Sequence, residues 1–246
     1  MNSMASNLFS DTELLCERCG YCLTGLPSGG NCPECGGPTD QSDPSHRGPS
    51  AWERPGSRLL SFLSTTLMVL CKPTRFYRSL ATRMDRRRSV WFGHLHVLIG
   101  SVLFATAIYL HNTWFVYWTK WPSVRDFMDE PVKGIAMYAV LSFCALTFLT
   151  RIASRLTNWE ATYRKFRLPL HVVLRGMDFH AAHYLPVGLV VAATVAGYRL
   201  LLQLHWLTAN ADLNYLYVLC GEVVVAAGYL FWTYWIAMCN MMYANA

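Results

Sequence analysis

Charged residues are scarce in this sequence. They make up 15% of its 246 residues, whereas about 25% is typical of a soluble globular domain. Apolar residues make up 53%, the mean hydropathy is +0.23, and the apolar blocks follow residue 58 with basic loops between them. Such an uneven distribution argues against one large globular core and indicates a chain that crosses a membrane several times.

Signals for secretion and for catalysis are also missing. Residues 1–12 have neither a basic start nor an apolar stretch, so we expect no signal peptide and a disordered N-terminus. The sequence contains no H-E-x-x-H, no G-x-S-x-G, no Walker loop and no paired catalytic carboxylates. We therefore predict that the protein is not an enzyme.

Two C-x2-C pairs stand near the N-terminus, within residues 13–37. Cys16 and Cys19 form the first pair, Cys32 and Cys35 form the second, and a glycine follows each pair. Two cysteines at this spacing on a tight turn aim both sulfurs at one point, and the glycine lets the backbone direct its N–H groups at the thiolates. Two such turns supply the four sulfurs of a closed, tetrahedral zinc site. We predict a small zinc ribbon in which these four cysteines hold a structural Zn2+ ion.

Three points of this prediction stay open. The cysteines could form disulfides instead, although a cytoplasmic head would lie in a reducing compartment. Cys22 makes a rival C-x2-C with Cys19, but no glycine follows it, so we interpret it as a spare thiol that could exchange with a ligand. Iron could fill the same four-sulfur site. Because a 25-residue segment has almost no core of its own, the ribbon should need its metal to fold.

The segment between the ribbon and the first span has two parts of different composition. Residues 38–58 are rich in proline, serine and glycine and cannot bury enough apolar area to order themselves, so we expect a flexible linker. Residues 59–90 begin with a mainly apolar stretch of twelve residues, which as a helix would cover only about 18 Å and is too short to cross a bilayer. Phe76, Leu80 and Met84 then recur every four residues between arginines, which is typical of amphipathic helices in the membrane interface. The alternative is a helix packed on the protein's own bundle.

Four later segments have the length of a bilayer-crossing helix, about 20 residues. Together they predict an all-α transmembrane helix bundle of four spans over residues 91–246, in addition to the interfacial helices and the ribbon. The run HVVLRGMDFHAAHY before the third span could form a second interfacial elbow. The predicted spans are Trp91–Leu110, Val132–Thr150, roughly Tyr184–Trp206 and roughly Asn214–Cys239.

Lysine and arginine alternate between the two sides of the predicted bundle. The region before the first span and the loop at 151–183 are rich in them, whereas the loop at 111–131 has two and the loop at 207–213 has none. Because cytoplasmic loops carry this excess, we predict that both termini are cytoplasmic. The aromatic cluster between Trp114 and Trp121 is expected to lie at the outer interface.

The ribbon segment carries a resemblance to a known group. The stretch CERCGYCLTGLPSGGNCPECG at 16–36 resembles the head of uncharacterised bacterial multi-pass membrane proteins, in which a C-x2-C-G-Y-x-L-x-G-L-P ribbon precedes a hydrophobic bundle. The stretch KPTRFYRSL at 72–80 is similar to the entry of Yip-type membrane bundles. Cys22 departs from the group's pattern, where an acidic residue is usual, which leaves the ligand choice open there. The resemblance implies zinc, the bacterial inner membrane and no known enzymatic activity.

Several histidines fall beside the predicted spans. His180 and His183 share one helical face before the third span, with Asp178 close by, and His94 and His96 begin the first span on the same side. Such a group could bind a metal. The interpretation that we favour is interfacial histidines bonded to headgroups or to the backbone.

Arg199 and Glu222 are predicted to form an ion pair inside the membrane. They lie equally far from the turn between the third and fourth spans, so antiparallel helices would bring them to a similar depth. A lone charge at mid-helix costs about 2.5–3.5 kcal/mol on insertion scales, and pairing would offset part of that cost. The alternative is that Arg199 snorkels to the outer headgroups while Glu222 is protonated. Gly197, Gly221 and Gly228 are expected to let helices approach closely.

These patterns predict a non-enzymatic integral membrane protein whose cytoplasmic ribbon has a scaffold or protein-docking role. Its expected partners are the lipid bilayer and a protein bound by the ribbon, and no small-molecule substrate is identifiable. Nucleic acid is not expected, because residues 13–37 contain one arginine against three glutamates. The alternative function is a small transporter or channel that uses Arg199 and Glu222, and an enzyme built around the histidines is a third hypothesis.

Overall fold

The chain divides into two units, each of which is described by itself. The computed structural model describes residues 13–27, 29–82, 84–119, 130–164, 166, 168–204, 206 and 211–245, without the side chains of 114–119 and 211–213. The predicted disordered start lies outside this description, and so do the side chains of the predicted outer aromatic cluster. The first unit comprises residues up to Gly93, Thr150–His180 and Thr233–Ala246, and the second comprises His94–Leu149 and Ala181–Trp232.

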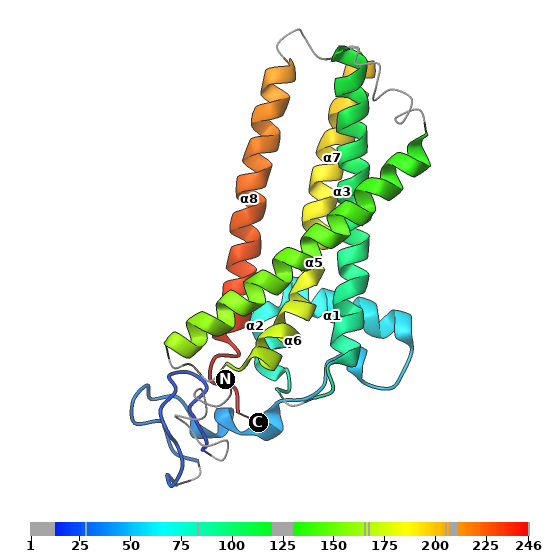
Figure 1. The fold of residues 1–246 in the computed structure, drawn as a ribbon. Helices are drawn as coiled ribbons and strands as arrows, with labels where there is room; N and C mark the ends of the chain where they lie inside the picture. The colour runs from blue at the N-terminus through cyan, green and yellow to red at the C-terminus, as the bar shows by residue number, and fades with distance from the viewer. Residues whose placement is uncertain are drawn as a thin grey trace, which may run out of the picture. The chain divides into compact units, whose positions relative to one another are not determined.

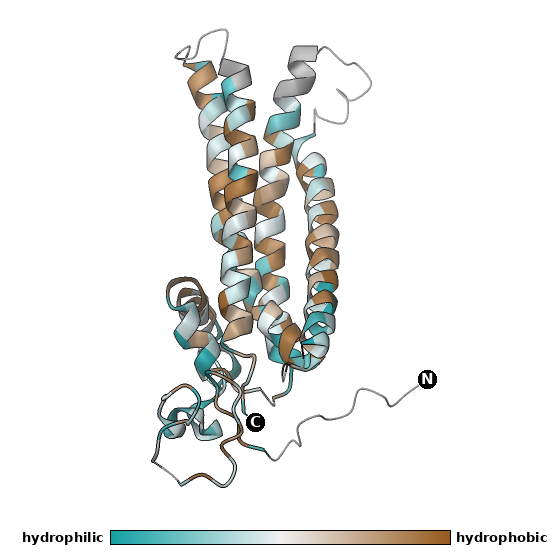
Figure 2. Ribbon diagram, turned by 90° about the vertical axis from the view of Figure 1, so that its left-hand side faces the viewer, coloured by the Kyte–Doolittle hydropathy of each residue, from teal (hydrophilic) through white to brown (hydrophobic). Residues whose placement is uncertain are grey.

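Four helices are long and apolar enough to cross a membrane (Figure 1). The prediction of an all-α fold with four spans is thereby confirmed, and the described residues form isolated β-bridges but no strand. Apolar residues line these helices over most of their length (Figure 2). The four helices are α3 (Arg87–Thr119), α5 (Pro131–Tyr163), α7 (Tyr184–Gln203) and α8 (Ala211–Cys239).

The long helices α5 and α8 expose apolar side chains over most of their surface. Only 6% of the most apolar window of each helix is buried within the protein. Val224 and Phe231 of α8, for example, are 71% and 63% exposed. Monomeric soluble proteins rarely expose continuous apolar surfaces of this extent, because each exposed Å2 costs about 25 cal/mol in water. The exposed surfaces therefore suit lipid as their solvent.

In the second unit, helices α3 and α7 approach closely at two glycines. A Cβ atom at Gly188 would lie 2.9 Å from the Cβ of Leu103, and one at Gly100 would lie 3.0 Å from the Cβ of Tyr184. Both positions therefore require glycine, because there is no room for a side chain. The expectation for Gly197, Gly221 and Gly228 was wrong: nothing lies within 4 Å of the position that a Cβ would take on any of the three, so they face open space.

The two short helices before α3 differ in what they expose. Helix α1 (Arg58–Cys71) buries Thr65, Thr66 and Val69 and leaves its leucine face exposed, as an interfacial helix requires. Helix α2 (Pro73–Ser79) starts on a proline, which is preorganised for the first helical turn. Phe76 of α2 and Leu80, which directly follows the helix, pack within the first unit and are 4% and 1% exposed, whereas Met84 lies beyond the helix and is 40% exposed. For Phe76 and Leu80 the interfacial prediction was therefore wrong, and the alternative of packing on the protein itself holds.

Helix α6 (Leu170–His180) covers most of the run that was considered as a second elbow. Eight of its eleven residues are buried, so it is a core helix of the first unit rather than an interfacial one. Phe179 on α6 contacts the rings of Phe76 and Phe92 at centroid distances of 5.1 and 5.2 Å. The short helix η4 (Ala181–His183) then leads into α7, and both of these belong to the second unit.

Residues 38–57, expected as a flexible linker, are folded. Three short 3-10 helices order them: η1 (Thr39–Ser42), η2 (Pro44–His46) and η3 (Ala51–Glu53). Trp52 is buried, its indole N–H donates to the carbonyl of Arg88, and its ring contacts Phe62 and Phe92. The segment as a whole is poor in apolar residues, but its one tryptophan buries a large apolar surface in an aromatic cluster.

A buried ion pair fixes the end of this segment. Arg175 of α6 donates from Nη2 to the Glu53 carboxylate at 2.8 Å, and their side chains are 2% and 1% exposed. The Glu53 carboxylate also accepts the backbone N–H and the hydroxyl of Ser50, which closes a capping box on η3. Nearby, Asp178 accepts two bonds from Arg86 and one from Ser89.

We expect Arg175→Met to lower the free energy of unfolding by about 3–5 kcal/mol, because it leaves the Glu53 carboxylate buried without its cation. Thermal unfolding of the purified protein in detergent measures the change. Adding Glu53→Gln to Arg175→Met should recover part of the loss. Arg87→Met, whose side chain is 90% exposed, is the matched control and should leave the unfolding temperature unchanged. Equal effects at Arg175 and Arg87 would contradict the buried pair.

Candidate metal centre

The four predicted cysteines converge on one point. The sulfur atoms of Cys16, Cys19, Cys32 and Cys35 all lie within 4.8 Å of one another, and two of the separations are 3.6 Å. Four sulfurs around a zinc ion at 2.3 Å stand about 3.8 Å apart, whereas a disulfide is about 2.05 Å long. All four thiols are free. The spacing and the donor chemistry therefore fit a tetrahedral metal ion.

Two near-identical turns hold the cysteines. In each turn, the glycine after the second cysteine donates its N–H to the carbonyl of the first, from Gly20 to Cys16 at 2.8 Å and from Gly36 to Cys32 at 2.9 Å. Both glycines have positive φ, 78° and 67°, which a residue with a side chain rarely adopts. Buried Leu23 packs with Cys16 and Cys32. The apolar core among the described ribbon residues is therefore small and consists partly of the cysteines themselves, so a metal would supply much of its stability.

The thiols differ in how readily they lose their protons. Burial acts to raise the pKa of Cys32, but backbone N–H groups of Cys35 and Glu34 and the neighbouring thiols lower it to about 7. Burial raises the pKa of Cys19 to about 12. Because a bound metal requires thiolates, binding releases protons and weakens as the pH falls.

Cys22 lies outside the four-cysteine group. It is exposed, and its backbone forms a bridge with Leu15 on the far side of the first turn. Its thiol is thus accessible to solvent, and its sulfur is not one of the four that lie close together.

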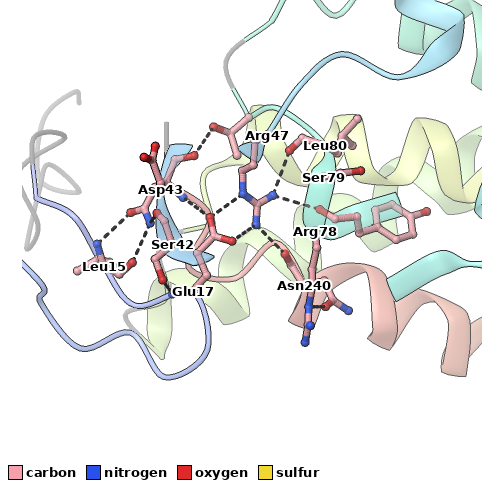
Figure 3. Close-up of polar contacts among 12 residues, drawn as sticks. Leu15, Glu17, Ser42, Asp43, Arg47, Arg78, Ser79, Leu80 and Asn240 are labelled. Carbon is pink, nitrogen blue, oxygen red and sulfur yellow. Dashed lines mark hydrogen bonds and ion pairs between the residues drawn. The ribbon is translucent and has the colours of Figure 1, made fainter. Parts of the chain in front are cut away.

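A buried arginine joins the ribbon to the rest of the first unit (Figure 3). Arg47 pairs with Glu17, the residue after the first cysteine, through Nε at 2.6 Å and Nη2 at 2.8 Å. Its remaining N–H groups donate to the carbonyls of Tyr77, Leu80 and Asn240. All five guanidinium donors are therefore used, and the side chains of Arg47 and Glu17 are 3% and 17% exposed.

Asn245 completes this arrangement from the C-terminal segment. Its side chain bonds the backbone of Leu15 in both directions, at 3.0 and 2.8 Å, and donates to the carbonyl of Ser42. Its own N–H donates to Glu17. We call the bonded set of Glu17, Arg47 and Asn245 the Arg47 clamp.

Tyr243 packs directly on the first cysteine turn. A Cβ atom on Gly20 would lie 2.6 Å from its ring, so the ring occupies the space that this glycine leaves. Burial raises the pKa of Tyr243, and the neighbouring Cys19 adds to the effect. The ribbon is thus packed against the C-terminal segment as well as bonded to it.

Sequence reasoning missed the Arg47 clamp. Glu17 counted only as one of the three glutamates of residues 13–37, and Arg47 as part of the basic region before the first span. No local pattern joins them, because the bonds of the clamp link residues that are 30 to 230 positions apart.

The alternative of a histidine metal site is not formed among the described residues, where the four cysteines are the group that could hold a metal ion. In the first unit, His180 bonds the hydroxyl of Thr233. In the second unit, His183 bonds the hydroxyl of Tyr229, and the ring of His94 lies against Phe143. These partners are side-chain hydroxyls and a ring, and His180 and His183 are buried, so the favoured interpretation of interfacial histidines bonded to headgroups or to the backbone does not describe these contacts.

The predicted ion pair between Arg199 and Glu222 was wrong. Arg199 donates to the hydroxyl of Thr113 and the carbonyl of Leu110, and Glu222 accepts the hydroxyl of Thr194. Glu222 is bonded to Thr194, which stands five residues before Arg199 on α7, or about 7.5 Å along the helix axis. The two charges therefore lie at different depths along α7.

Four apolar helices together with a four-cysteine cluster define a membrane protein that could bind a metal ion at its N-terminal head. No family model, curated protein or solved structure matches this chain.

Elemental analysis of the purified protein should find about one metal ion per chain, because the four sulfurs make one closed site. The double variant Cys16→Ser, Cys35→Ser should lose the metal, since hydroxyls are poor replacements for thiolates. Cys22→Ser is the matched control and should keep it. Loss of metal from Cys22→Ser, or full retention in the double variant, would show that other residues hold the ion.

Proposed function

We propose that this chain is a non-enzymatic, multi-pass protein of the bacterial inner membrane, and one of the ribbon-bearing membrane proteins that its CERCGYCLTGLP segment resembles. Its cytoplasmic zinc ribbon has a structural role and serves as a docking surface for a protein partner. The zinc assignment is supported by four cysteine sulfurs that lie within 4.8 Å of one another, which is the ligand set of a closed structural zinc site.

The cytoplasmic location of the ribbon is supported by the distribution of basic residues. Of the 21 lysines and arginines, eleven lie in the segment up to Gly93 and six in Thr150–His180, all within the first unit. This unit also contains both ends of the described chain, because Leu15 and Asn245 are bonded to each other. A unit with most of the positive charge is expected on the cytoplasmic side.

The docking role rests on one observation: the Arg47 clamp fixes a ribbon that still exposes apolar side chains. Tyr21 and Leu26 are 40% and 37% exposed on the loop between the two cysteine turns. Tyrosine is enriched at the centres of protein interfaces. A ribbon immobilised by a fully bonded guanidinium presents these side chains without the entropic cost of ordering a tethered module.

A reporter enzyme that works only outside the cytoplasm should be inactive when fused to the C-terminus and active when fused after Ser123. The reason is that the basic segments should stay on the cytoplasmic side, where the reporter cannot mature. Activity of both fusions is measured in whole cells at matched expression. An active C-terminal fusion would reverse the orientation, and with it the assignment of the ribbon to a reducing compartment.

Tyr21→Ala combined with Leu26→Ala should reduce recovery of a co-purifying protein by at least about tenfold, as expected when two interface anchors are removed. The metal content should be unchanged, because neither side chain is a ligand. Glu34→Ala, an exposed substitution on the second cysteine turn, is the matched control and should co-purify the partner as the wild type does. Equal recovery from all three proteins would remove the support for docking through this loop.

A further inference from the structure

The first unit contains a polar cavity between helix α1 and the segment that precedes it. Its volume is about 460 Å3, within the usual range of ligand sites. Residues of the 45–54 segment and one face of α1 form its walls, together with the end of α2. The ionisable side chains among the described lining residues are those of His46, Arg47 and Arg54, and none of the lining residues is acidic. The cavity therefore favours an anion.

Arg54 provides the cation that a ligand can reach. The donors of Arg47 are all used within the clamp, whereas Arg54 is exposed and makes one bond, from Nε to the carbonyl of Pro49 at 3.2 Å. A Cβ atom on Gly48 would lie 3.9 Å from Nη2 of Arg54, so the guanidinium stands at the cavity wall. Its two Nη groups have no hydrogen bond or ion pair within the described part of the chain. A guanidinium held in this way has its fork free for two oxygens of a phosphate.

Hydroxyl groups of the cavity walls complement this cation. Ser64 of α1 is exposed, and its hydroxyl is bonded to none of the described residues. The hydroxyl of Ser79 donates to the carbonyl of Phe76 at 3.0 Å and keeps its lone pairs for a further donor. The walls thus offer donors to a phosphate and acceptors to a headgroup that carries hydroxyls of its own.

The cavity lies where the first membrane span begins. The backbone N–H of Trp52 donates to the hydroxyl of Thr65, which lines the cavity, and its indole N–H donates to the carbonyl of Arg88 in the first turn of α3. Trp91, three residues later on α3, is 66% exposed, as is usual for an aromatic residue in the membrane interface. These bonds therefore place the cavity at the level of the phospholipid headgroups.

Helix α1 also presents an apolar face beside the cavity. Leu60 and Leu67 are 67% and 60% exposed. With 3.6 residues per turn, both stand within about 60° of Ser64 around the helix axis. Acyl chains that lie against these leucines would therefore have their headgroup beside the cavity.

We propose that this cavity binds the headgroup of an anionic phospholipid, with its phosphate on the guanidinium of Arg54 and its acyl chains against the leucines of α1. The ammonium group of a zwitterionic headgroup would find no carboxylate among the described lining residues. A soluble phosphate ester has the same phosphate chemistry but would leave the leucines uncovered. The site is independent of the role proposed for the ribbon.

Phosphatidylglycerol is the probe, and native mass spectrometry of the full-length protein in detergent counts the bound lipids. The wild type should bind one phosphatidylglycerol at least about tenfold more tightly than phosphatidylcholine with the same chains. Arg54→Gln should remove this preference, because a charge-assisted contact of this kind is worth about a tenfold change in affinity. Arg87→Gln, which removes a 90% exposed cation at the start of α3, is the matched control and should bind as the wild type does. Equal binding of the two lipids by the wild type, or equal losses from both variants, would overturn the proposal.

Glycerol 3-phosphate tests the soluble alternative. Present at the same concentration as phosphatidylglycerol, it should not displace the lipid, because it lacks the acyl chains. Displacement would assign the cavity to a soluble phosphate ester and overturn the choice of a lipid.

Two further measurements separate a lost site from a lost fold. Ser64→Trp fills the cavity from an exposed position without a change of charge, and it should lose the bound phosphatidylglycerol while its unfolding temperature in lipid-free detergent is unchanged. On the wild type, phosphatidylglycerol with a photoreactive headgroup should label residues 45–54 or Ser64, as peptide mass spectrometry identifies. Retained binding by a folded Ser64→Trp, or labelling confined to other segments, would contradict the site.

Discussion

The bonded guanidinium of Arg47 is the interaction on which the first unit depends. It meets one carboxylate from the ribbon and three carbonyls from the ends of α2 and α8, so four segments distant in sequence share one side chain. Carbonyls at helix C-termini lack partners within the helix and carry partial negative charge, which makes a planar cation their natural complement. A lysine has three donors and no fork, so it could not satisfy this set.

The two buried arginines of this unit differ in how many of their guanidinium donors are hydrogen-bonded. Arg47 uses every donor, whereas Arg175 satisfies Nη2 through Glu53 and leaves Nε and Nη1 without partners in the described structure. Burial opposes the charge at both positions, and complete bonding is what offsets that cost at Arg47. The Arg47 clamp is therefore a source of rigidity. The pair of Arg175 and Glu53 fixes the register between the 38–57 segment and α6, but its incomplete bonding offsets less of the cost of burial.

The sequence predicted those features that local spacing controls. The two C-x2-C-G turns and the four apolar stretches each depend on residues within one segment, and their patterns were sufficient. The order of residues 38–57 was not predictable in this way, because Trp52, Glu53 and Arg47 find their partners 13 to 193 residues away. The pairing of Arg199 with Glu222 failed for a related reason: equal distance from a turn does not give equal depth when the two helices end at different distances from it.

The Arg47 clamp joins the earliest described residues of the chain to some of the latest. Leu15 and Glu17 are synthesised before any of the long helices, yet their partner Asn245 follows α8. The bonds of Arg47 to Glu17, Tyr77 and Leu80 can form before α8 is made, but those from Asn240 and Asn245 need the last helix to be inserted with its C-terminal end on the ribbon's side. Completion of the clamp thus requires the C-terminal end of α8 to lie on the ribbon's side, and a chain with an inverted or missing final span would leave the ribbon without the bonds of Asn240 and Asn245.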